Sequence, residues 1–331
     1  MSLQERQKSK DLVHLRRVDR AKRSIAAKDV LSVLDLSHGE LAGVLALASE
    51  MKQHRGNGEG ANRPLAGRHV ALLFEKPSLR TRSTFVIAVR ELGGEVIEPL
   101  AEVALGSRET VEDVARSLER WVQGAVVRTF AQIRLEQFAA AAPRLHVVNA
   151  LTDEEHPCQA IADMLTLKER FGELAGRTLA FVGDGNNVAA SLAHAGAMLG
   201  VHVRVASPAG HELPARIADA ARAAAIVNAT VTVTNDPVEA VRGADAVYTD
   251  VWASMGQEDQ TEARARVFQP YQVNDALMAA AGPDAIFMHC LPAHRGHEVT
   301  DSVIDSPASV VFEQAENRLH TQKALLALLM A

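Results

Sequence analysis

The sequence predicts an α/β protein made of two doubly wound domains, each a parallel sheet flanked by helices. Short apolar runs typical of buried strands alternate with stretches of helical period along most of the chain. At 331 residues the chain exceeds the usual size of one core, so two domains are expected. A hydrophobic content of 47% with only 4% aromatic residues suits an α/β protein rich in alanine, valine and leucine. Alternation of this kind places the strands in parallel, with helices on both faces of the sheet.

The first half of the chain contains four expected strands with helices between them. Ser37, with Glu40 three residues later, is typical of a capping box at the start of a helix. A polar, glycine-rich loop over 55–64 precedes the first strand. The expected strands are 69–74, 95–99, 124–130 and 146–148. Helices are expected within 30–54, between Ser78 and the Gly93-Gly94 pair, over 110–122 and over 135–142.

A long helix from Pro157 to Gly172 separates the two halves, and we place the domain boundary near it. Proline is tolerated in the first turn of a helix, where its missing N–H has no partner to lose. Further strands are expected over 178–182, 201–206, 230–234, 245–251 and 285–290. Further helices are expected over 187–199, 214–225 and 315–330. Residues 253–270 are expected to form a long polar loop, a feature that is often functional, such as a lid.

The composition excludes several classes of protein. A net charge of −6 gives no support for nucleic-acid binding, and no apolar run approaches the ~20 residues of a membrane span. Two cysteines in a chain of this length imply a reducing compartment without a disulfide scaffold. Residues 1–24 lack the apolar core of a secretory signal, and their acidic residues argue against a transit peptide. We therefore expect a cytoplasmic protein, and the sequence assigns no function to residues 1–24.

The stretch FEKPSLRTRSTF, residues 74–85, joins the first strand to the following helix and is an expected anion site. Free backbone N–H groups and the positive end of the helix dipole meet at such a junction. Ser78 and Thr81 add hydroxyl donors, and Arg80 and Arg82 add forked guanidinium donors suited to phosphate. Since cations are unfavourable at a helix N-terminus, two of them there favour a bound anion. The alternative is a serine-capped helix with a solvated basic first turn.

Three more polar side chains of the first half are candidates for the same site. Arg128 ends a strand, and ligands of parallel sheets gather beyond the carboxyl ends of strands, so it is expected to converge with Arg80 unless it is a surface arginine. His156 opens a helix, as a neutral donor, a proton carrier or simply a cap. Gln159 offers an amide one turn further on, while Cys158 is expected to be buried packing.

A glycine-rich turn, GDGNN at 183–187, follows a strand and opens a helix. It suggests dinucleotide binding, but Val188 stands where the third glycine of G-x-G-x-x-G belongs. The asparagine pair, which includes Asn187, instead favours hydrogen bonding to a polar ligand. The hypothesis that the protein is a nucleotide-dependent oxidoreductase therefore rests on this turn alone.

Two strand ends of the second half carry Asp250 and Cys290. An aspartate at a strand end is a suitable partner for an ammonium group, and Cys290 is a candidate reactive or substrate-binding thiol. The histidines of HCLPAHRG, residues 289–296, raise the question of zinc, but no second Cys/His pair lies at ligand spacing, so no metal is expected. Arg318, near the start of the last helix, is either a further site cation or a surface one.

Together and in this order, the motifs resemble the aspartate/ornithine carbamoyltransferase family. SLRTR is similar to its carbamoyl-phosphate loop, S-x-R-T-R, while HPCQ, GDGNN, DVWASMGQE, HCLPAHRG and ENRLHTQKA resemble the ornithine branch. The resemblance, from about Lys28 to the C-terminus, implies carbamoyl transfer from carbamoyl phosphate to the δ-amine of L-ornithine, giving L-citrulline and phosphate. It implies no cofactor or metal, and a homotrimer or assembly of trimers. The expected domains are 1–150 for carbamoyl phosphate, onto which helix 315–331 packs back, and 151–314 for ornithine.

The resemblance also implies a role for each matching residue. Those expected to bind carbamoyl phosphate are Ser78, Leu79, Arg80, Thr81, Arg128, His156, Gln159, Cys290, Leu291 and Arg318. Those expected to bind ornithine are Asn187, Asp250, Ser254 and Met255. The candidate catalytic residues are Cys290, Arg128, His156 and Asp250. Arg128 and His156, with Thr81, would stabilise charge on the carbonyl oxygen. Asp250 and Cys290 would receive the amine and help remove its proton, although the departing phosphate is an alternative base.

Departures from the family pattern include Val86, where a glutamate is usual, and Ala104. At the latter position a polar residue, often glutamine, usually reaches a neighbouring subunit's site. The changes imply weaker phosphate affinity, a substitute donor such as Ser107 or Arg108, or a different acceptor. Carbamoyl transfer to another amine or amino acid, and a non-catalytic trimeric homologue, are therefore the alternative functions.

Overall fold

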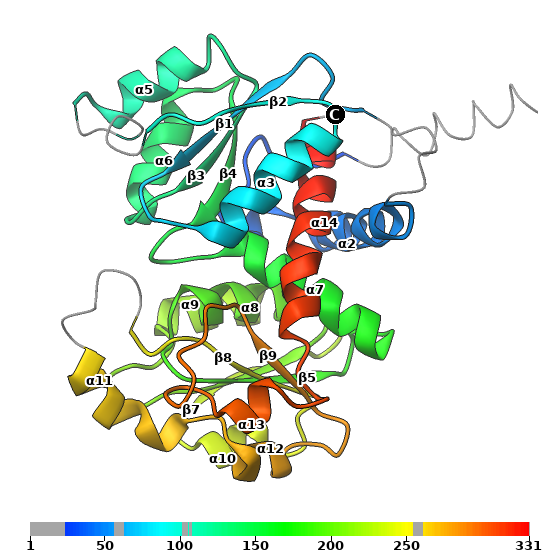
Figure 1. Ribbon diagram of the computed structural model, residues 1–331, viewed down its shortest axis with the longest axis vertical. Helices are drawn as coiled ribbons and strands as arrows, with labels where there is room; N and C mark the ends of the chain where they lie inside the picture. Colours follow the sequence, from blue (N-terminus) through cyan, green and yellow to red (C-terminus); the bar gives the residue numbers. More distant parts are fainter. Residues whose placement is uncertain (1–23, 56–62, 101–104, 106–107, 254–260, 331) are drawn as a thin grey trace, which may run out of the picture.

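Two parallel β-sheets organise the protein in the computed structural model, which describes residues 24–55, 63–100, 105, 108–253 and 261–330 (Figure 1). The first sheet has the order β2-β1-β3-β4, and the second the order β7-β6-β5-β8-β9. All of these strand pairs are parallel, which confirms the predicted fold class. The strands of the first sheet are β1 (His69–Phe74), β2 (Glu95–Ile97), β3 (Gly124–Arg128) and β4 (His146–Leu151). Those of the second are β5 (Thr178–Val182), β6 (His202–Ala206), β7 (Val231–Thr234), β8 (Ala246–Thr249) and β9 (Ile286–His289).

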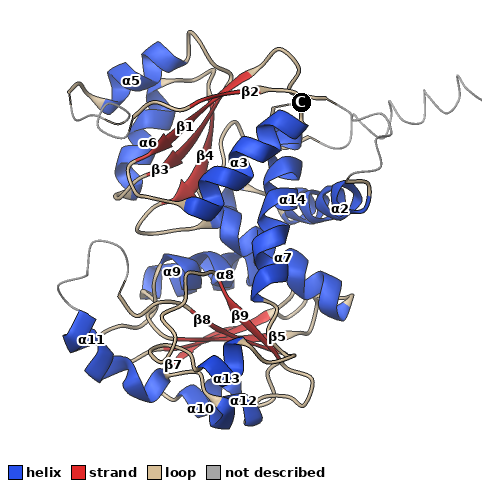
Figure 2. Ribbon diagram, in the orientation of Figure 1, coloured by secondary structure: helices blue, strands red, loops and turns tan. Residues whose placement is uncertain are grey.

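Helices cover both faces of the first sheet because successive side chains of each strand point to opposite faces (Figure 2). In β1, Ala71 and Leu73 pack with the apolar stripes of α5 (Val111–Leu118) and α6 (Gln132–Ala141). Val70 and Leu72 point the other way, into the core that includes α3 (Leu79–Glu91) and α2 (His38–Gln53). The predicted capping box is confirmed at the start of α2, where Ser37 and Glu40 bond to each other's backbone N–H.

The second sheet is covered in the same way. One face packs against α7 (Pro157–Phe171), α8 (Asn187–Met198) and α9 (Ala215–Ala223). The other face packs against α10 (Pro237–Val241), α12 (Asp275–Ala279) and α13 (Asp301–Ile304). These last three helices, of four or five residues, were not predicted, because helical periodicity cannot be recognised in so few residues.

Two buried helices, α7 and α14 (Val311–Leu329), run between the sheets (Figure 1). Asn317 of α14 donates hydrogen bonds to Thr166 Oγ1 (3.0 Å) and Glu169 Oε2 (2.7 Å) of α7, and it accepts one from Lys52 of α2 (2.8 Å). Helix α14 begins four residues before the predicted start, because Val311 is buried in the core of the second sheet. Its later turns lie in the core that α2 and α3 share. The division at residue 150 stays a prediction.

The polar loop predicted over 253–270 is wrong for its second part, which forms α11 (Thr261–Phe268). Phe268 is fully buried and stacks on Trp252, with 6.1 Å between the ring centroids. This contact anchors a segment whose charged residues suggested a solvated loop. Residues 254–260, including the candidates Ser254 and Met255, lie outside the described residues, as does Ala104. Within the described chain, no helix is both long and apolar enough to span a bilayer.

Candidate active site at the strand ends of both sheets

A cluster of buried basic groups lies where β3, α7 and α14 meet. The side chains of Arg128, His156 and Arg318 are 6%, 5% and 3% exposed, so neither arginine is the surface cation that the sequence left open. Arg318 donates a hydrogen bond to Thr81 Oγ1 at the start of α3. Buried Nε atoms of both arginines have no hydrogen-bond partner among the described residues. Buried polar groups normally find partners, so this cluster is built to receive an acceptor-rich molecule.

Burial and mutual repulsion lower the pKa values of these basic groups. Burial, and then the charge of Arg318, lower the pKa of Arg128 to about 10. Burial, Arg318 and Arg128 lower the pKa of His156 well below its usual value, so its imidazole is neutral at neutral pH. Burial also lowers the pKa of Arg80, and the interaction with Cys290 offsets part of that fall. Arg128 and Arg80 both interact electrostatically with Cys290, which agrees with their predicted convergence.

His156 is held by its backbone rather than acting as a side-chain cap. It occupies the N-cap position of α7, yet its side chain makes no cap hydrogen bond. Its backbone N–H donates instead to Ser191 Oγ of α8 at 2.9 Å, and Ser191 Oγ donates to buried Glu155 at 2.9 Å. The buried Nδ1 of its ring has no protein partner within the described part of the chain. The capping interpretation is wrong, and the imidazole remains available as a neutral hydrogen-bonding group.

The loop before α3 is fixed by ion pairs that the sequence did not reveal. Lys76 donates to Asp153 Oδ1 at 2.6 Å and lies 4.2 Å from the ring centroid of Phe130. Arg82, which the sequence offered as a phosphate donor, is exposed and pairs with Glu98. Of the two arginines of SLRTR, it is therefore Arg80 that is half-buried and lies near Cys290.

Two other residues of SLRTR lie at the start of α3, and their part in ligand binding stays a prediction. Ser78 is the N-cap of α3 but its side chain makes no cap hydrogen bond. Leu79, the first residue of the helix, is 76% exposed. Val86, the first family departure, packs against the main core, where a glutamate would be buried at a cost.

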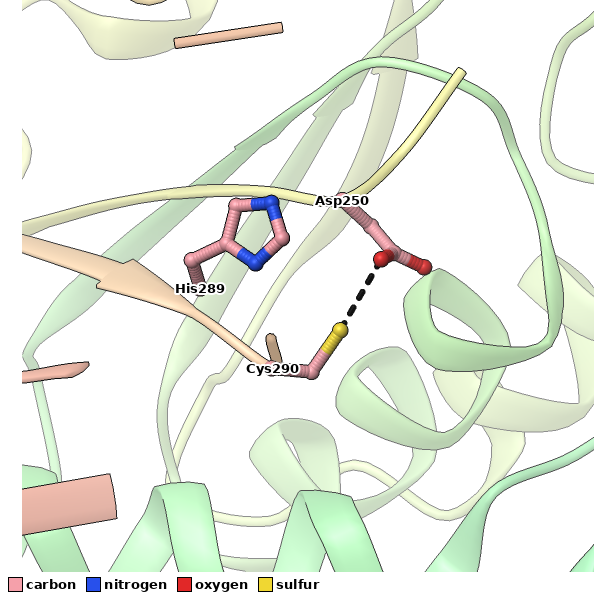
Figure 3. Close-up of side chains that lie close together, drawn as sticks. All are labelled: Asp250, His289 and Cys290. Atoms are coloured by element: carbon pink, nitrogen blue, oxygen red, sulfur yellow. Dashed lines mark hydrogen bonds between the residues drawn. The ribbon is translucent and has the colours of Figure 1, made fainter. Parts of the chain in front are cut away.

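Asp250 and Cys290 meet across neighbouring strands of the second sheet (Figure 3). Cys290 Sγ donates to Asp250 Oδ1 at 2.9 Å, and Asn186 Nδ2 donates to Asp250 Oδ2 at 2.8 Å. Burial, followed by the charge of Asp250, raises the pKa of the Cys290 thiol well above its usual value. The thiol is therefore a hydrogen-bond donor rather than a thiolate nucleophile. The carboxylate points one oxygen at each donor and remains able to accept more.

Ligand atoms of Asp250, His289 and Cys290 lie within 4.8 Å of one another, a grouping that the sequence reasoning about zinc missed. Asp250 comes from a strand 40 residues away, so sequence spacing could not reveal it. Both ring nitrogens of His289 are engaged by the protein: Nδ1 accepts from Leu291 N–H at 2.9 Å, and Nε2 lies 3.2 Å from buried Glu298. A metal ion would have to break these contacts, so the donor set does not favour one, and the expectation of no metal stays a prediction.

Leu291 forms a turn directly after the thiol. Its φ of 55° lies in the left-handed region, and its bond to Pro292 is cis. A non-glycine residue in that region is uncommon and is often found at ligand sites. The role of Leu291 in substrate binding stays a prediction.

The GDGNN turn is filled by protein contacts. A Cβ on Gly185 would lie 2.2 Å from the backbone nitrogen of Leu213, and Asp184 pairs with Arg264 of α11. Asn186 caps α8 and also binds Asp250, a role that the sequence did not single out. Asn187, the predicted ligand contact, donates to the carbonyl of Thr152 at 2.5 Å.

Two parallel sheets with a buried basic cluster and a carboxylate–thiol pair are features of an α/β protein with a site suited to an anionic ligand. Two family models match the chain. One, described as the carbamoyl-P binding domain of aspartate/ornithine carbamoyltransferase, matches residues 28–169, and the other, described as its Asp/Orn binding domain, matches residues 175–329. The protein belongs to the aspartate/ornithine carbamoyltransferase family.

Individual relatives agree with this assignment. The chain is 52% identical over 308 residues to ornithine carbamoyltransferase of Parafrankia sp. (strain EAN1pec), covering 92% of this chain and 97% of the relative. It is 50% identical over 310 residues to that of Symbiobacterium thermophilum, covering 93% and 99%. Among solved structures, ornithine carbamoyltransferase from Pyrococcus furiosus superposes with a TM-score of 0.88 at 46% identity, covering 93% and 98% of the two chains.

Proposed function

We propose that this protein transfers the carbamoyl group of carbamoyl phosphate to the δ-amine of L-ornithine, giving L-citrulline and phosphate. The observation that carries the proposal is a pair of buried arginines, each with an Nε atom that has no partner among the described residues, beside the Asp250–Cys290 pair. An anion and an ammonium group are the ligands that these two halves of the site suit. The family of the chain, and relatives named ornithine carbamoyltransferase over nearly their whole length, support the same reaction.

The basic half of the site would hold carbamoyl phosphate. Arg80, Arg318 and the first-turn N–H groups of α3 would bind its phosphate. Arg128 and neutral His156 would donate to the carbamoyl oxygen, on which negative charge builds as the amine attacks. Neutral His156 suits this role, since a third buried cation beside the two arginines would be costly. The cluster thus stabilises the charge of the transition state as well as that of the substrate.

The acidic half of the site would receive ornithine. The δ-ammonium group would pair with Asp250, and Cys290 fixes one oxygen of that carboxylate through its S–H donor. For transfer, the amine loses a proton and its nitrogen forms a bond to the carbamoyl carbon. The bond from that carbon to the bridging oxygen breaks, and phosphate leaves with the electron pair. Asp250 and the departing phosphate are the two candidate bases for the proton.

Citrulline formation by the purified protein tests the function directly. We expect turnover with L-ornithine and carbamoyl phosphate that Arg80→Ala reduces by about 100-fold or more, as expected for loss of a transition-state charge contact. Arg216→Ala is the matched control, because this exposed arginine of α9 pairs with Glu154 outside the site. A panel of other amines tests acceptor choice. No turnover with ornithine would contradict the proposal. Turnover with another amine alone would mean that this amine, and not ornithine, is the acceptor.

We also propose a homotrimer or an assembly of trimers. A cavity of about 500 Å³ beside the α3 loop is lined by residues that include Leu79 and Leu100, which are 76% and 73% exposed. Exposed apolar side chains next to a cavity suit burial by a second copy of the chain. Light scattering after size exclusion checks the mass. A cytoplasmic location remains part of the proposal, and cell fractionation tests it.

A further inference from the structure

A fully buried carboxylate that the proposed mechanism does not use lies beneath the site. Asp163 of α7 is 0% exposed. Its Oδ1 accepts hydrogen bonds from Gln159 Nε2 and from Gln314 Nε2, each at 2.9 Å, and its Oδ2 accepts one from Tyr248 OH at 3.1 Å. The three donors come from α7, α14 and β8, so one carboxylate joins elements that pack on both sheets.

Asp163 determines which way the amide of Gln159 points. An ionised carboxylate only accepts hydrogen bonds, so it selects the NH₂ end of the amide and directs Oε1 away from itself. That Oε1 is buried and has no hydrogen-bond partner among the described residues. The two ends of an amide differ little in shape, so the side chain would lose this preference without Asp163. The result is a buried acceptor held at the start of α7, three residues after His156.

The same carboxylate orders the end of β9. Gln314 uses its Nε2 for Asp163 and its Oε1 to accept the backbone N–H of His289 at 2.9 Å. His289 directly precedes Cys290. Loss of Asp163 would thus release two amides, one on each side of the proposed substrate position.

We propose that Asp163 is a positioning residue that makes the site selective for an acyl phosphate bearing an NH₂ group over one bearing a methyl group. The proposal rests on the proposed function, and adds to it the source of discrimination between carbamoyl and acetyl phosphate. These molecules have nearly the same shape, so apolar contacts separate them poorly. An oriented acceptor separates them well, because a methyl group would leave Gln159 Oε1 buried and unsatisfied.

The test compares the Ki of acetyl phosphate, as an inhibitor competing with carbamoyl phosphate, with the KM of carbamoyl phosphate in the citrulline assay. We expect Asp163→Ala to lower the ratio of Ki to KM by roughly ten- to hundredfold, the range expected for one unsatisfied buried acceptor. Asp163→Asn keeps an acceptor oxygen for both glutamines and can donate to Tyr248, so its ratio should stay within about threefold of wild type. Tyr248→Phe removes only the bond to Oδ2 and should leave the ratio unchanged.

A merely structural role predicts a different pattern. It would lower kcat or stability in Asp163→Ala without changing the ratio, and that result would overturn the proposal. Should Asp163→Ala fail to fold, Asp163→Thr replaces it, because a hydroxyl both donates and accepts and so does not select one end of the amide. Citrulline turnover by the wild-type protein reports on the proposed function independently, so failure of one proposal is distinguishable from failure of the other.

Discussion

Replacing Arg128 with methionine is expected to stabilise the ligand-free protein and to weaken its response to phosphate, because the charge of Arg128 adds to that of nearby Arg318. The guanidinium is 6% exposed, and no acceptor for it occurs among the described residues. Burial and Arg318 lower its pKa from 12.5 to about 10, and at about 1.4 kcal/mol per tenfold this fall corresponds to about 3 kcal/mol. A cation whose pKa is depressed by folding destabilises the folded state at every pH below that pKa. Methionine keeps the apolar stem and removes the charge.

Urea unfolding with and without inorganic phosphate measures both effects. Without phosphate, Arg128→Met should raise the free energy of unfolding by up to about 3 kcal/mol, since the pKa change sets an upper limit. With phosphate at 100 times its Kd for the wild type, the wild-type protein should gain about 2.7 kcal/mol, and the variant should gain less at the same phosphate concentration. The exposed arginine variant Arg216→Met is the control and should keep the phosphate gain.

Two outcomes would refute this reasoning. A ligand-free variant less stable than the wild type would mean that the arginine is satisfied in the folded protein rather than strained. An undiminished phosphate gain would mean that the charge of Arg128 adds nothing to the binding of the anion. Either result would remove the electrostatic argument for Arg128, whatever the activity of the variant.

Three further predictions concern backbone packing, titration and the thiols. Gly185→Ala should lose about 3 kcal/mol or fail to fold in urea titration, because its Cβ would meet backbone atoms at 2.2 and 2.4 Å. Gly39→Ala in α2 meets nothing within 4 Å and should gain about 0.5–1 kcal/mol; equal effects would contradict the packing argument. Burial raises the pKa of Asp163 to about 6, so this residue should add stability as pH falls from 6 to 4, and Asp163→Asn should lose that pH dependence in the same titration. Burial raises the pKa of Cys158 to about 12 and that of Cys290 well above 9, so both thiols should be protonated in the native protein at pH 8. Mass spectrometry should therefore show that iodoacetamide labels native protein far more slowly than urea-unfolded protein. Rapid labelling of Cys290 in the native protein would contradict its protonated state.

The sequence alone identified most of the elements that carry the site. Apolar runs and punctuating glycines predicted β1, β5 and α7 with the observed bounds or within a residue or two of them. These signals are local, since the spacing of apolar residues within a short segment predicts which face of a strand or helix is buried. Helix α12 was not predicted because it is too short to show helical periodicity, and α11 was not predicted because the packing of its buried Phe268 depends on residues elsewhere in the chain.

The candidate site shows the same division between local and distant signals. Arg80, Arg128, His156, Asp250 and Cys290 could each be singled out by their position at an element end. Which arginine of this loop enters the site could not be read from the sequence, because Arg82 and Arg80 differ in what the fold places beside them. Arg82 pairs with Glu98, whereas half-buried Arg80 lies near Cys290. Sequence patterns predict the position of a residue on a strand or helix, but they do not predict which residues from elsewhere in the chain surround its side chain.

What the sequence by itself determined is the two-sheet α/β architecture, the family and the motifs at its strand ends, since each depends on residues close together in the chain. What only the tertiary structure decided is the electrostatic state of those motifs. Contacts between residues far apart in sequence produce the neutral state of His156, the protonated state of Cys290 and the hydrogen bonds to Asp163. Burial and neighbouring charge set a pKa and an amide's orientation, and both are properties of the folded chain.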